Sequence, residues 1–445
     1  MKLLCISLGC DKNLVDTEMM LGLLNQDGYT FTDDEQEADV IVINTCCFIN
    51  DAKEESVNTI LEMAELKKTG QCKALIVTGC LAQRYKQEII DEIPEVDGIL
   101  GTSTYDEISN VLKEALGGRH ISRFHDLDAL PEVAAERVIT TGGYYAFLKI
   151  AEGCNKHCTY CIIPSLRGNY RSVPMERIVK EAQALADKGV KELILVAQET
   201  TLYGVDLYGE KTLPRLLREL CKISGIQWIR IQYCYPEEIT DELIRTIKEE
   251  EKICHYLDIP IQHASDKILR RMGRKTNQAQ LREMIAKLRR EIPDIALRTT
   301  LISGFPGETK EDHETLMEFV DEMEFERLGV FAYSAEEDTP AAEFEDQVPQ
   351  ELKEERRDEI MELQQEIAFD HSDEMVGRVL DVMIEGKIAD EAAYVGRTYM
   401  DAPNVDGFIF INTDKELMSG NFVRAKVTGA LEYDLIGEMC DEPAQ

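Results

Sequence analysis

The chain has 445 residues, 44% of them hydrophobic, and carries a formal net charge of −36. This length exceeds what one hydrophobic core usually serves, so two or three domains are expected. The excess of negative charge argues against passive binding to nucleic-acid phosphates and favours a basic protein partner, although a generally acidic proteome would explain it equally well.

Thirteen cysteines are present, and the N-terminus runs straight into a strand-like segment, residues 2–8. No secretory leader is therefore expected, and the cysteines are not interpreted as a disulfide framework. Every apolar run falls short of the roughly 20 residues that span a bilayer. A cytoplasmic location with reduced thiols and no membrane insertion is the expectation.

Residues 1–118 alternate short apolar runs with helical patterns. Strand-like segments at 3–8, 40–43 and 74–77 are followed by helical segments at 14–24, 51–66 and 81–93. Strand, helix and strand at this spacing predict a parallel sheet with right-handed crossovers. Residues 119–138 show no sustained period and are predicted to be a linker.

Residues 139–371 repeat the alternation six times, which predicts a partial (β/α)6 barrel with its active site at the carboxyl ends of the strands. The expected strands are 146–150, 193–196, 228–232, 256–259, 296–301 and 327–331. The expected helices are 175–188, 213–223, 241–250, 278–291 and 310–323, followed by a charged exit helix at 349–370.

Residues 372–445 alternate apolar and polar positions at 379–385, 407–411 and 422–433, with glycines between these segments. This pattern predicts a small antiparallel β-barrel. The overall fold class is α/β, with three domains at 1–118, 139–371 and 372–445.

The most specific motif is Cys154, Cys158 and Cys161, three cysteines on the loop that follows the first barrel strand. Three thiolates leave one iron of a 4Fe–4S cluster open, whereas a four-cysteine set would close it. The open iron can bind the amino and carboxylate groups of S-adenosylmethionine (SAM). Zinc is the alternative, but common zinc sites add a second cysteine pair, and no such pair follows.

Cys10, Cys46 and Cys80 each fall just past the end of one of the three predicted N-terminal strands. Parallel sheets bind ligands at that edge, so these thiols are expected to lie together. The alternative is three unrelated core cysteines. Cys47, next to Cys46, is a second choice for the middle ligand.

These motifs resemble the methylthiotransferase family of radical SAM enzymes over nearly the whole chain. Residues 7–13, 44–46 and 78–84 resemble the family's N-terminal domain, residues 153–161 its radical SAM loop, and the C-terminal barrel its TRAM domain. Cys47 departs from the glycine expected after Asn44-Thr45-Cys46.

Within the family, residues 163–168 and 258–266 resemble the RimO branch, which modifies an aspartate of the small-subunit ribosomal protein S twelve. The resemblance implies insertion of sulfur and a methyl group at the β carbon of that aspartate. The branch that modifies tRNA tends to carry a tyrosine and a threonine before the Arg-Gly pair and a Gln-Ser-Gly-Ser stretch in the second motif.

The resemblance implies two 4Fe–4S clusters, an auxiliary one on Cys10, Cys46 and Cys80 and a radical SAM one on Cys154, Cys158 and Cys161. It also implies SAM as a cofactor and a reductant such as flavodoxin or ferredoxin. Beyond the cluster ligands no catalytic residue is identified.

Four further residues are expected to contact SAM, because they follow barrel strands: Gln198, Gln262, Ser303 and Gly304. A plain turn would explain Ser303 and Gly304 equally well.

Two competing functions remain, a tRNA adenosine methylthiotransferase and a non-catalytic two-cluster electron carrier or scaffold. Residues 372–445 carry six Lys and Arg against fifteen Asp and Glu, so direct RNA binding is not expected. Residues 1–118 are also acidic, with nine basic and twenty-two acidic side chains, which weakens that argument. An electron carrier would need neither the barrel nor an open iron.

Overall fold

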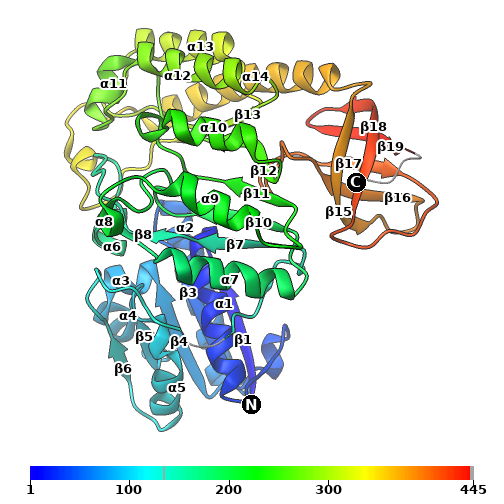
Figure 1. Cartoon of the computed structure of the whole chain (residues 1–445). Coiled ribbons are helices and arrows are strands. Elements are labelled where there is room, and N and C mark those ends of the chain that lie inside the picture. The colour runs from blue at the N-terminus through cyan, green and yellow to red at the C-terminus, as the bar shows by residue number, and fades with distance from the viewer. Residues whose placement is uncertain (134–135, 441–445) are drawn as a thin grey trace. The chain divides into compact units, whose positions relative to one another are not determined.

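The computed structural model describes residues 1–133 and 136–440, which form two compact units (Figure 1). The first unit comprises residues 1–140, 149–173 and 334–342. The second comprises residues 141–148, 174–333 and the chain from 343 onward.

The first unit is built on a six-stranded sheet in which every paired strand is parallel, in the order β2-β1-β3-β4-β5-β6. Its strands are β1 (Lys2–Ser7), β2 (Thr30–Phe31), β3 (Val40–Thr45), β4 (Ala74–Gly79), β5 (Gly98–Leu100) and β6 (Ile121–Arg123). Its helices are α1 (Asp11–Gln26), α2 (Asn50–Thr69), α3 (Cys80–Tyr85), α4 (Gln87–Glu92) and α5 (Ile108–Leu116).

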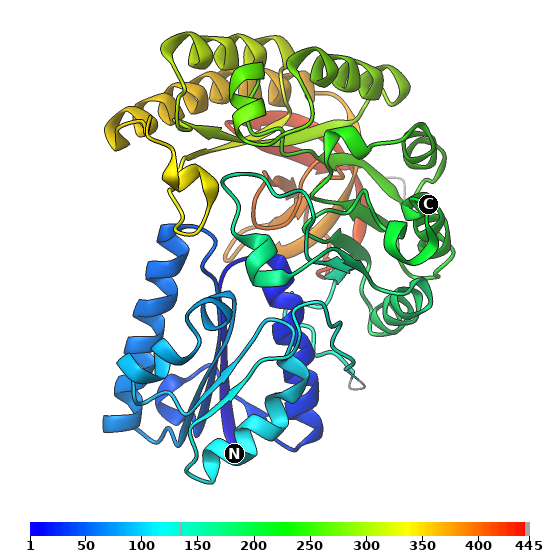
Figure 2. The same cartoon turned by 90° about the vertical axis from the view of Figure 1, so that its left-hand side faces the viewer.

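Helices cover both faces of this sheet (Figure 2). Alternate residues of β3 enter different cores, since Ile41 and Ile43 pack in one buried cluster while Val40 and Val42 pack in another. A strand buried on both faces explains the continuous apolar run at 40–43.

The predicted parallel sheet is confirmed, but three short strands were not expected from the sequence. Strand β6 lies inside the stretch 119–138 that was predicted to be a linker, and three residues are too few to show a period. The helix expected over 81–93 is divided into α3 and α4 at Lys86, whose φ of 44° leaves the helical region.

Residues 149–173 also belong to the first unit, although the predicted boundaries include them in the barrel domain 139–371. They form an antiparallel pair of two-residue strands, β8 (Ala151–Glu152) and β9 (Arg171–Ser172), and the chain between the strands contains helix α6 (Ile163–Arg167). Side chains of this segment make buried ion pairs with α1, described below, which is the physical reason for the grouping. The domain boundaries otherwise stay a prediction.

The second unit contains the predicted six-stranded barrel sheet, in the order β14-β13-β12-β11-β10-β7, and all six expected strands are confirmed. The strands are β7 (Tyr145–Lys149), β10 (Glu192–Val196), β11 (Trp228–Ile231), β12 (Ile253–Asp258), β13 (Ala296–Ser303) and β14 (Arg327–Ala332). The helices are α7 (Met175–Asp187), α8 (Val205–Tyr208), α9 (Leu213–Cys221), α10 (Asp241–Glu249), α11 (Asp266–Arg271), α12 (Gln278–Glu291), α13 (Lys310–Met323) and α14 (Gln350–Glu374).

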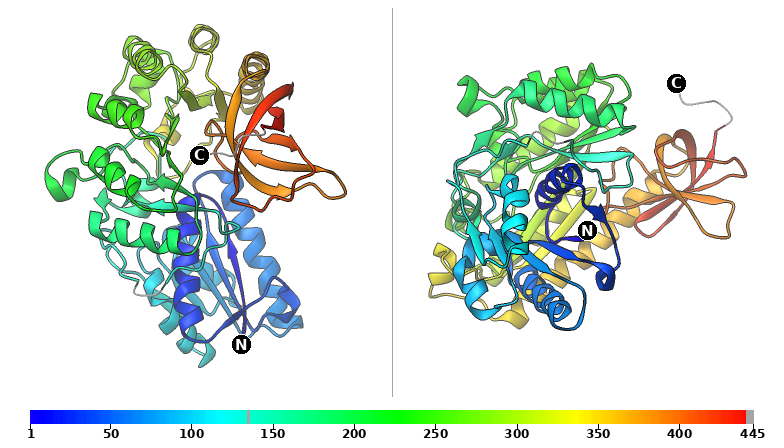
Figure 3. Two further views of the ribbon diagram at one scale, coloured as in Figure 1. Left: turned by 45° about the vertical axis from the view of Figure 1, so that its right-hand side comes forward. Right: turned by 90° about the horizontal axis from the view of Figure 1, so that it is seen from below.

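Helix α14 leads into a closed five-stranded barrel (Figure 3). Its strands are β15 (Val379–Lys387), β16 (Ala393–Arg397), β17 (Ile409–Asn412), β18 (Phe422–Leu431) and β19 (Asp434–Met439). The barrel is not antiparallel throughout, because β17 and β19 run parallel. An odd number of strands cannot alternate in direction around a closed ring, so one parallel pair is unavoidable.

The C-terminal barrel shares its core with the six-stranded sheet of the same unit. Trp228 and Tyr256 pack in one buried cluster with residues of the small barrel. Glu192, fully buried on β10, pairs with Arg230 at 2.7 Å and with Arg397 of the small barrel at 2.7 Å. Among the described helices, none is both long and apolar enough to cross a membrane.

Candidate functional site

Cys10, Cys46 and Cys80, hereafter the sheet triad, lie where three neighbouring parallel strands end. Cys10 is the N-cap of α1, three residues after β1 ends, Cys46 directly follows β3, and Cys80 begins α3 directly after β4. The three thiols interact electrostatically with one another. The structure therefore gathers these three cysteines at one edge of the sheet, as the strand order predicts.

One glycine and one asparagine hold the loops of the sheet triad close together. Gly9 has φ +85°, and a Cβ there would lie 2.5 Å from Cys46 Cβ and 2.8 Å from its Sγ. The Asn13 amide donates to the carbonyls of Leu8 and Thr45, each at 3.0 Å. These contacts join the end of β1 to the end of β3, so Cys10 and Cys46 are held by backbone geometry.

Burial raises the pKa of the Cys46 thiol to about 12 and also raises the pKa of Cys80. Thiolate is the form that binds iron, and the positive charge of bound iron offsets the cost of deprotonating these buried sulfurs. Cys47 is fully buried and lies beside Cys80 and Arg84. Cys46 interacts electrostatically with both Cys10 and Cys80, and the strongest electrostatic partners of Cys47 include Cys80, Arg84 and Cys46.

Cys154, Cys158 and Cys161, hereafter the loop triad, lie within eight consecutive residues after β7 and β8. The β8–β9 hairpin closes this loop, and the Cys154 amide donates to Gly168 O at 3.2 Å. Gly153 has φ +76°, and a Cβ there would lie 2.1 Å from Asn169 O. Cys154 and Cys158 are buried, while Cys161 is half-buried.

Among residues 1–133 and 136–440, no three His, Cys, Asp or Glu side chains are grouped as around a single metal ion. In an iron–sulfur cluster each thiolate binds a different iron, so the cluster itself separates its cysteines. Two sets of three thiols, each set in a single compact region, are the donor chemistry that such clusters require.

A group of buried charges next to the sheet triad was not expected from the sequence. Asp16, Glu152 and Arg167 are each 5% exposed or less. Arg167 pairs with Asp16 at 2.8 Å, a contact between residues 151 positions apart. The only sequence pattern that could have indicated it is a charged residue at position 16 on the apolar face of a predicted helix.

The four residues expected to contact SAM lie at the carboxyl ends of strands in the second unit. Gln198 follows β10, and Gln262 follows β12 with φ +71° and an isolated bridge to Leu301. Ser303 ends β13, and its hydroxyl donates to Lys353 O at 2.9 Å. A Cβ on Gly304 would lie 2.3 Å from Lys353 Cγ on helix α14. Close packing against this helix is therefore sufficient to explain why a glycine stands here.

Gln232, directly after β11, is a fifth residue at this edge, and sequence reasoning did not single it out. Its side chain is 6% exposed, and Oε1 has no hydrogen-bond partner among the described residues. A buried acceptor in a native protein normally has a partner, so a bound ligand with a donor would fit this amide.

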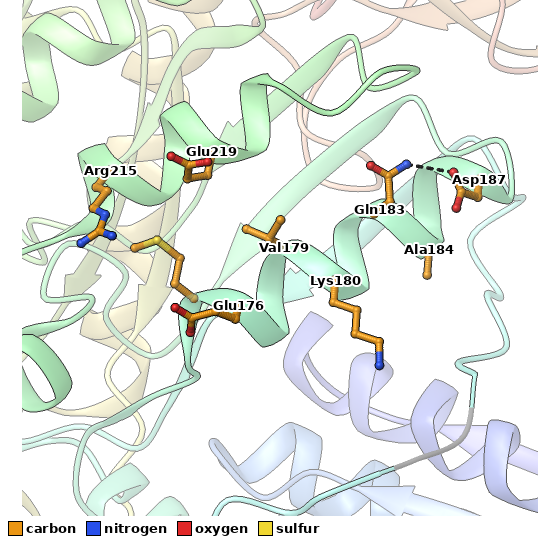
Figure 4. Close-up of a pocket in the computed structure, with 9 residues that line it drawn as sticks. Glu176, Val179, Lys180, Gln183, Ala184, Asp187, Arg215 and Glu219 are labelled. Carbon is orange, nitrogen blue, oxygen red and sulfur yellow. Dashed lines mark hydrogen bonds between the residues drawn. The ribbon is translucent and has the colours of Figure 1, made fainter.

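A groove of about 800 Å³ lies elsewhere on the second unit, between α7 and α9 (Figure 4). Charged side chains of both signs line it, including Glu176, Lys180, Arg215 and Glu219. Its lining comes from helices alone and includes no cysteine and no residue from a strand end. The groove is therefore separate from the candidate site.

Three regions of the chain match known protein families. Residues 2–101 match the Uncharacterized protein family UPF0004, residues 148–320 the Radical SAM superfamily, and residues 376–440 the TRAM domain.

Several relatives match over the whole chain, and each is described as ribosomal protein uS12 methylthiotransferase RimO. The protein from Lachnoclostridium phytofermentans is 68% identical over 98% of this chain and 99% of its own. Those from Clostridioides difficile and Acetivibrio thermocellus are 50% and 51% identical, over 100% and 99% of this chain and 100% and 98% of their own.

Solved structures resemble the chain at low identity, which indicates the fold alone. The radical S-adenosylmethionine methyltransferase TsrM from Kitasatospora setae, with cobalamin and a 4Fe–4S cluster bound, is similar with a TM-score of 0.55, 14% identity and 76% of each chain covered. The cobalamin-dependent S-adenosylmethionine radical enzyme OxsB is similar with a TM-score of 0.53, 12% identity, and 81% of this chain and 56% of that one covered.

Proposed function

Because this chain belongs to the RimO family of ribosomal protein uS12 methylthiotransferases, we propose that it attaches a methylthio group to the β carbon of an aspartate of uS12. The observation that carries the proposal is the presence of two separate sets of three thiols, each gathered by its own part of the fold.

The loop triad is proposed to hold the radical SAM cluster, and Cys10, Cys46 and Cys80 the auxiliary cluster. Cys46 is preferred over Cys47 because it interacts with both other thiols of the sheet triad. The strongest electrostatic partners of Cys47 include Cys80, Arg84 and Cys46.

A C–H bond next to a carboxylate has no acidity that a side chain could exploit at neutral pH, so this reaction requires radical chemistry. When bound, the two clusters and SAM supply the radical that this chemistry needs and the sulfur that is inserted. The chain's own residues position the reactants and exclude water, which reactive intermediates require.

SAM is proposed to contact the amide side chains at the carboxyl ends of the sheet strands, namely Gln198, Gln232 and Gln262. The buried acceptor of Gln232 supports this proposal, because SAM carries amino and hydroxyl donors. Ser303 and Gly304 are proposed to border the SAM site rather than to bind SAM directly. The Ser303 hydroxyl already donates to Lys353 O, and the Lys353 side chain packs against Gly304.

A basic protein is the proposed partner of the acidic C-terminal barrel. Arg397, one of its six basic side chains, is fully buried between Glu192 and Glu385 and so cannot meet a phosphate. The remaining surface is acidic, which favours a basic ribosomal protein and disfavours direct RNA binding. A flavodoxin or ferredoxin is the proposed electron donor, and the cytoplasm is the proposed location.

The proposal is tested by incubating the anaerobically reconstituted full-length protein with SAM, a reductant and either uS12 or tRNA. Mass spectrometry should find the methylthio group on an aspartate of uS12 and none on tRNA. The TRAM domain match keeps a tRNA methylthiotransferase as the second candidate. Methylthiolated adenosine with unmodified uS12 would establish that candidate instead.

A further inference from the structure

A buried network of four charged side chains lies beside the sheet triad within the first unit. Arg167 donates to Asp16 Oδ2 at 2.8 Å and to Glu152 Oε2 at 3.2 Å. Lys149 donates to Glu152 Oε2 at 2.7 Å and also to Asp16. The two cations and two carboxylates balance one another, so the network as a whole is neutral.

Arg167 is the member of this network that reaches the thiols. Arg167 and Cys80 meet at one atom, because the Cys80 thiol lies 4.0 Å from Asn13 Oδ1, the oxygen that also accepts from the guanidinium. Arg167 also interacts electrostatically with Cys10. Its second amino group donates to Asn13 Oδ1, and the amide nitrogen of Asn13 holds the loops before Cys10 and Cys46.

The guanidinium is only 2% exposed, so it has lost almost all of its hydration. Burying a charge is costly unless it is paired and hydrogen-bonded on every side. Asp16 and Glu152 accept from one amino group of the guanidinium, while Asn13, next to Cys80, accepts from the other. The side facing Cys80 is the side where an iron–sulfur cluster would bring additional negative charge.

We propose that Arg167 is a positioning residue for the auxiliary cluster, which holds a fixed positive charge against its thiolates and thereby raises its reduction potential. Reduction adds one electron, and a nearby cation stabilises the more negative form, most strongly where water is excluded. This inference rests on the proposed function only in taking Cys10, Cys46 and Cys80 as cluster ligands.

The test uses the full-length chain with Cys154, Cys158 and Cys161 all replaced by alanine, so that any bound iron belongs to the sheet triad. Its midpoint potential is measured by anaerobic redox titration with electron paramagnetic resonance. Arg167→Gln, which is neutral but can still hydrogen-bond, should shift the potential to a more negative value. Arg167→Lys, which keeps the charge, should stay close to the parent.

Lys149→Gln is the matched control, because it removes the same charge from the same two carboxylates. The partners of Lys149 are Asp16, Glu152 and the Tyr105 ring rather than a thiol. Its shift should be clearly smaller than that of Arg167→Gln. An equal shift of the midpoint potential in both variants would overturn the role assigned to Arg167, because any buried positive charge would then affect the cluster equally.

An unchanged potential in Arg167→Gln would likewise overturn the proposal. If Arg167→Gln binds no iron, Arg167→Lys decides: iron retained at the parent's potential supports a role for the charge, and iron lost contradicts it. If the parent itself holds no iron, the assignment of the sheet triad fails, which is a failure of the proposed function instead.

Discussion

The loop triad comes from eight consecutive residues, whereas the sheet triad comes from three strand ends that span residues 10–80. The first is fixed by one hairpin and a few local backbone hydrogen bonds. The second exists only when β1, β3 and β4 are paired in order. A site of the second kind should therefore respond to changes in the fold that leave a local motif intact.

The largest expected effect separates the two triads by function. Cys154→Ala, Cys158→Ala or Cys161→Ala should each abolish reductive cleavage of SAM, because three thiolates are needed to hold a cluster with one open iron. Iron analysis should still find the cluster on the sheet triad, although both triads belong to one compact unit. Retained SAM cleavage in any of the three variants would disprove the ligand assignment.

The reverse substitutions should give the opposite result. Cys10→Ala, Cys46→Ala or Cys80→Ala should leave SAM cleavage measurable but stop formation of the methylthio product. Cys47→Ala is the matched control, since this thiol is buried next to Cys46. If Cys47→Ala loses iron and Cys46→Ala keeps it, the choice between the two neighbours is wrong.

Features that depend on residues near one another in the chain could be predicted from the sequence. Helices α12 and α13 have the predicted bounds, and a capping box fixes the start of each, at Asn277 with Gln280 and at Thr309 with Asp312. The loop triad is equally local. Short apolar runs, each followed by a helical pattern, identify all three strands of the sheet triad, and strand order then brings the cysteines together.

Features that depend on distant partners could not be predicted. Strands of two or three residues such as β2 and β6 have no period, and only pairing with a neighbour defines them. The parallel β17–β19 pair follows from barrel closure, which no single segment encodes. The contact of Arg167 with Asp16 joins residues 151 positions apart, so a charge on the apolar face of a predicted helix is its only sign in the sequence.

A third prediction tests how strictly the backbone holds the sheet triad. Gly9→Ala should lower the iron content of the sheet triad, because its Cβ would collide with Cys46. Gly28→Ala is the matched control, since Gly28 has the same φ of +85° but no atom within 4 Å of the added Cβ. Both variants pay about 1–3 kcal/mol of backbone strain. Equal iron loss in both would attribute the effect to strain rather than to the collision.

A fourth prediction concerns SAM rather than iron. Gln232→Leu should weaken SAM binding about tenfold, which corresponds to about 1.4 kcal/mol, the scale of one buried hydrogen bond. Equilibrium binding to the reconstituted protein measures this effect. Gln227→Leu is the control, because Gln227 is exposed just before the same strand begins. Unchanged affinity in Gln232→Leu would remove this residue from the SAM site.

The smallest expected effect concerns the partner of the C-terminal barrel. Deleting the barrel is a poor test, because it would leave Glu192 and Arg230 without Arg397 and open the shared core. Charge reversal on its surface avoids this problem. Asp414 and Glu438 are exposed and line a groove of about 690 Å³ on the barrel. Asp414→Lys with Glu438→Lys should slow association with uS12 by about two- to tenfold at low salt.

Salt and a matched variant decide whether that effect belongs to the barrel. At 0.1 M salt, charges are screened over roughly 10 Å. The difference in association rate between the wild type and the barrel variant should therefore become smaller. Glu62→Lys with Glu65→Lys changes the net charge equally, on exposed positions of α2. If that variant slows association as much, only the overall charge attracts the substrate, and the barrel has no special part in recognising uS12.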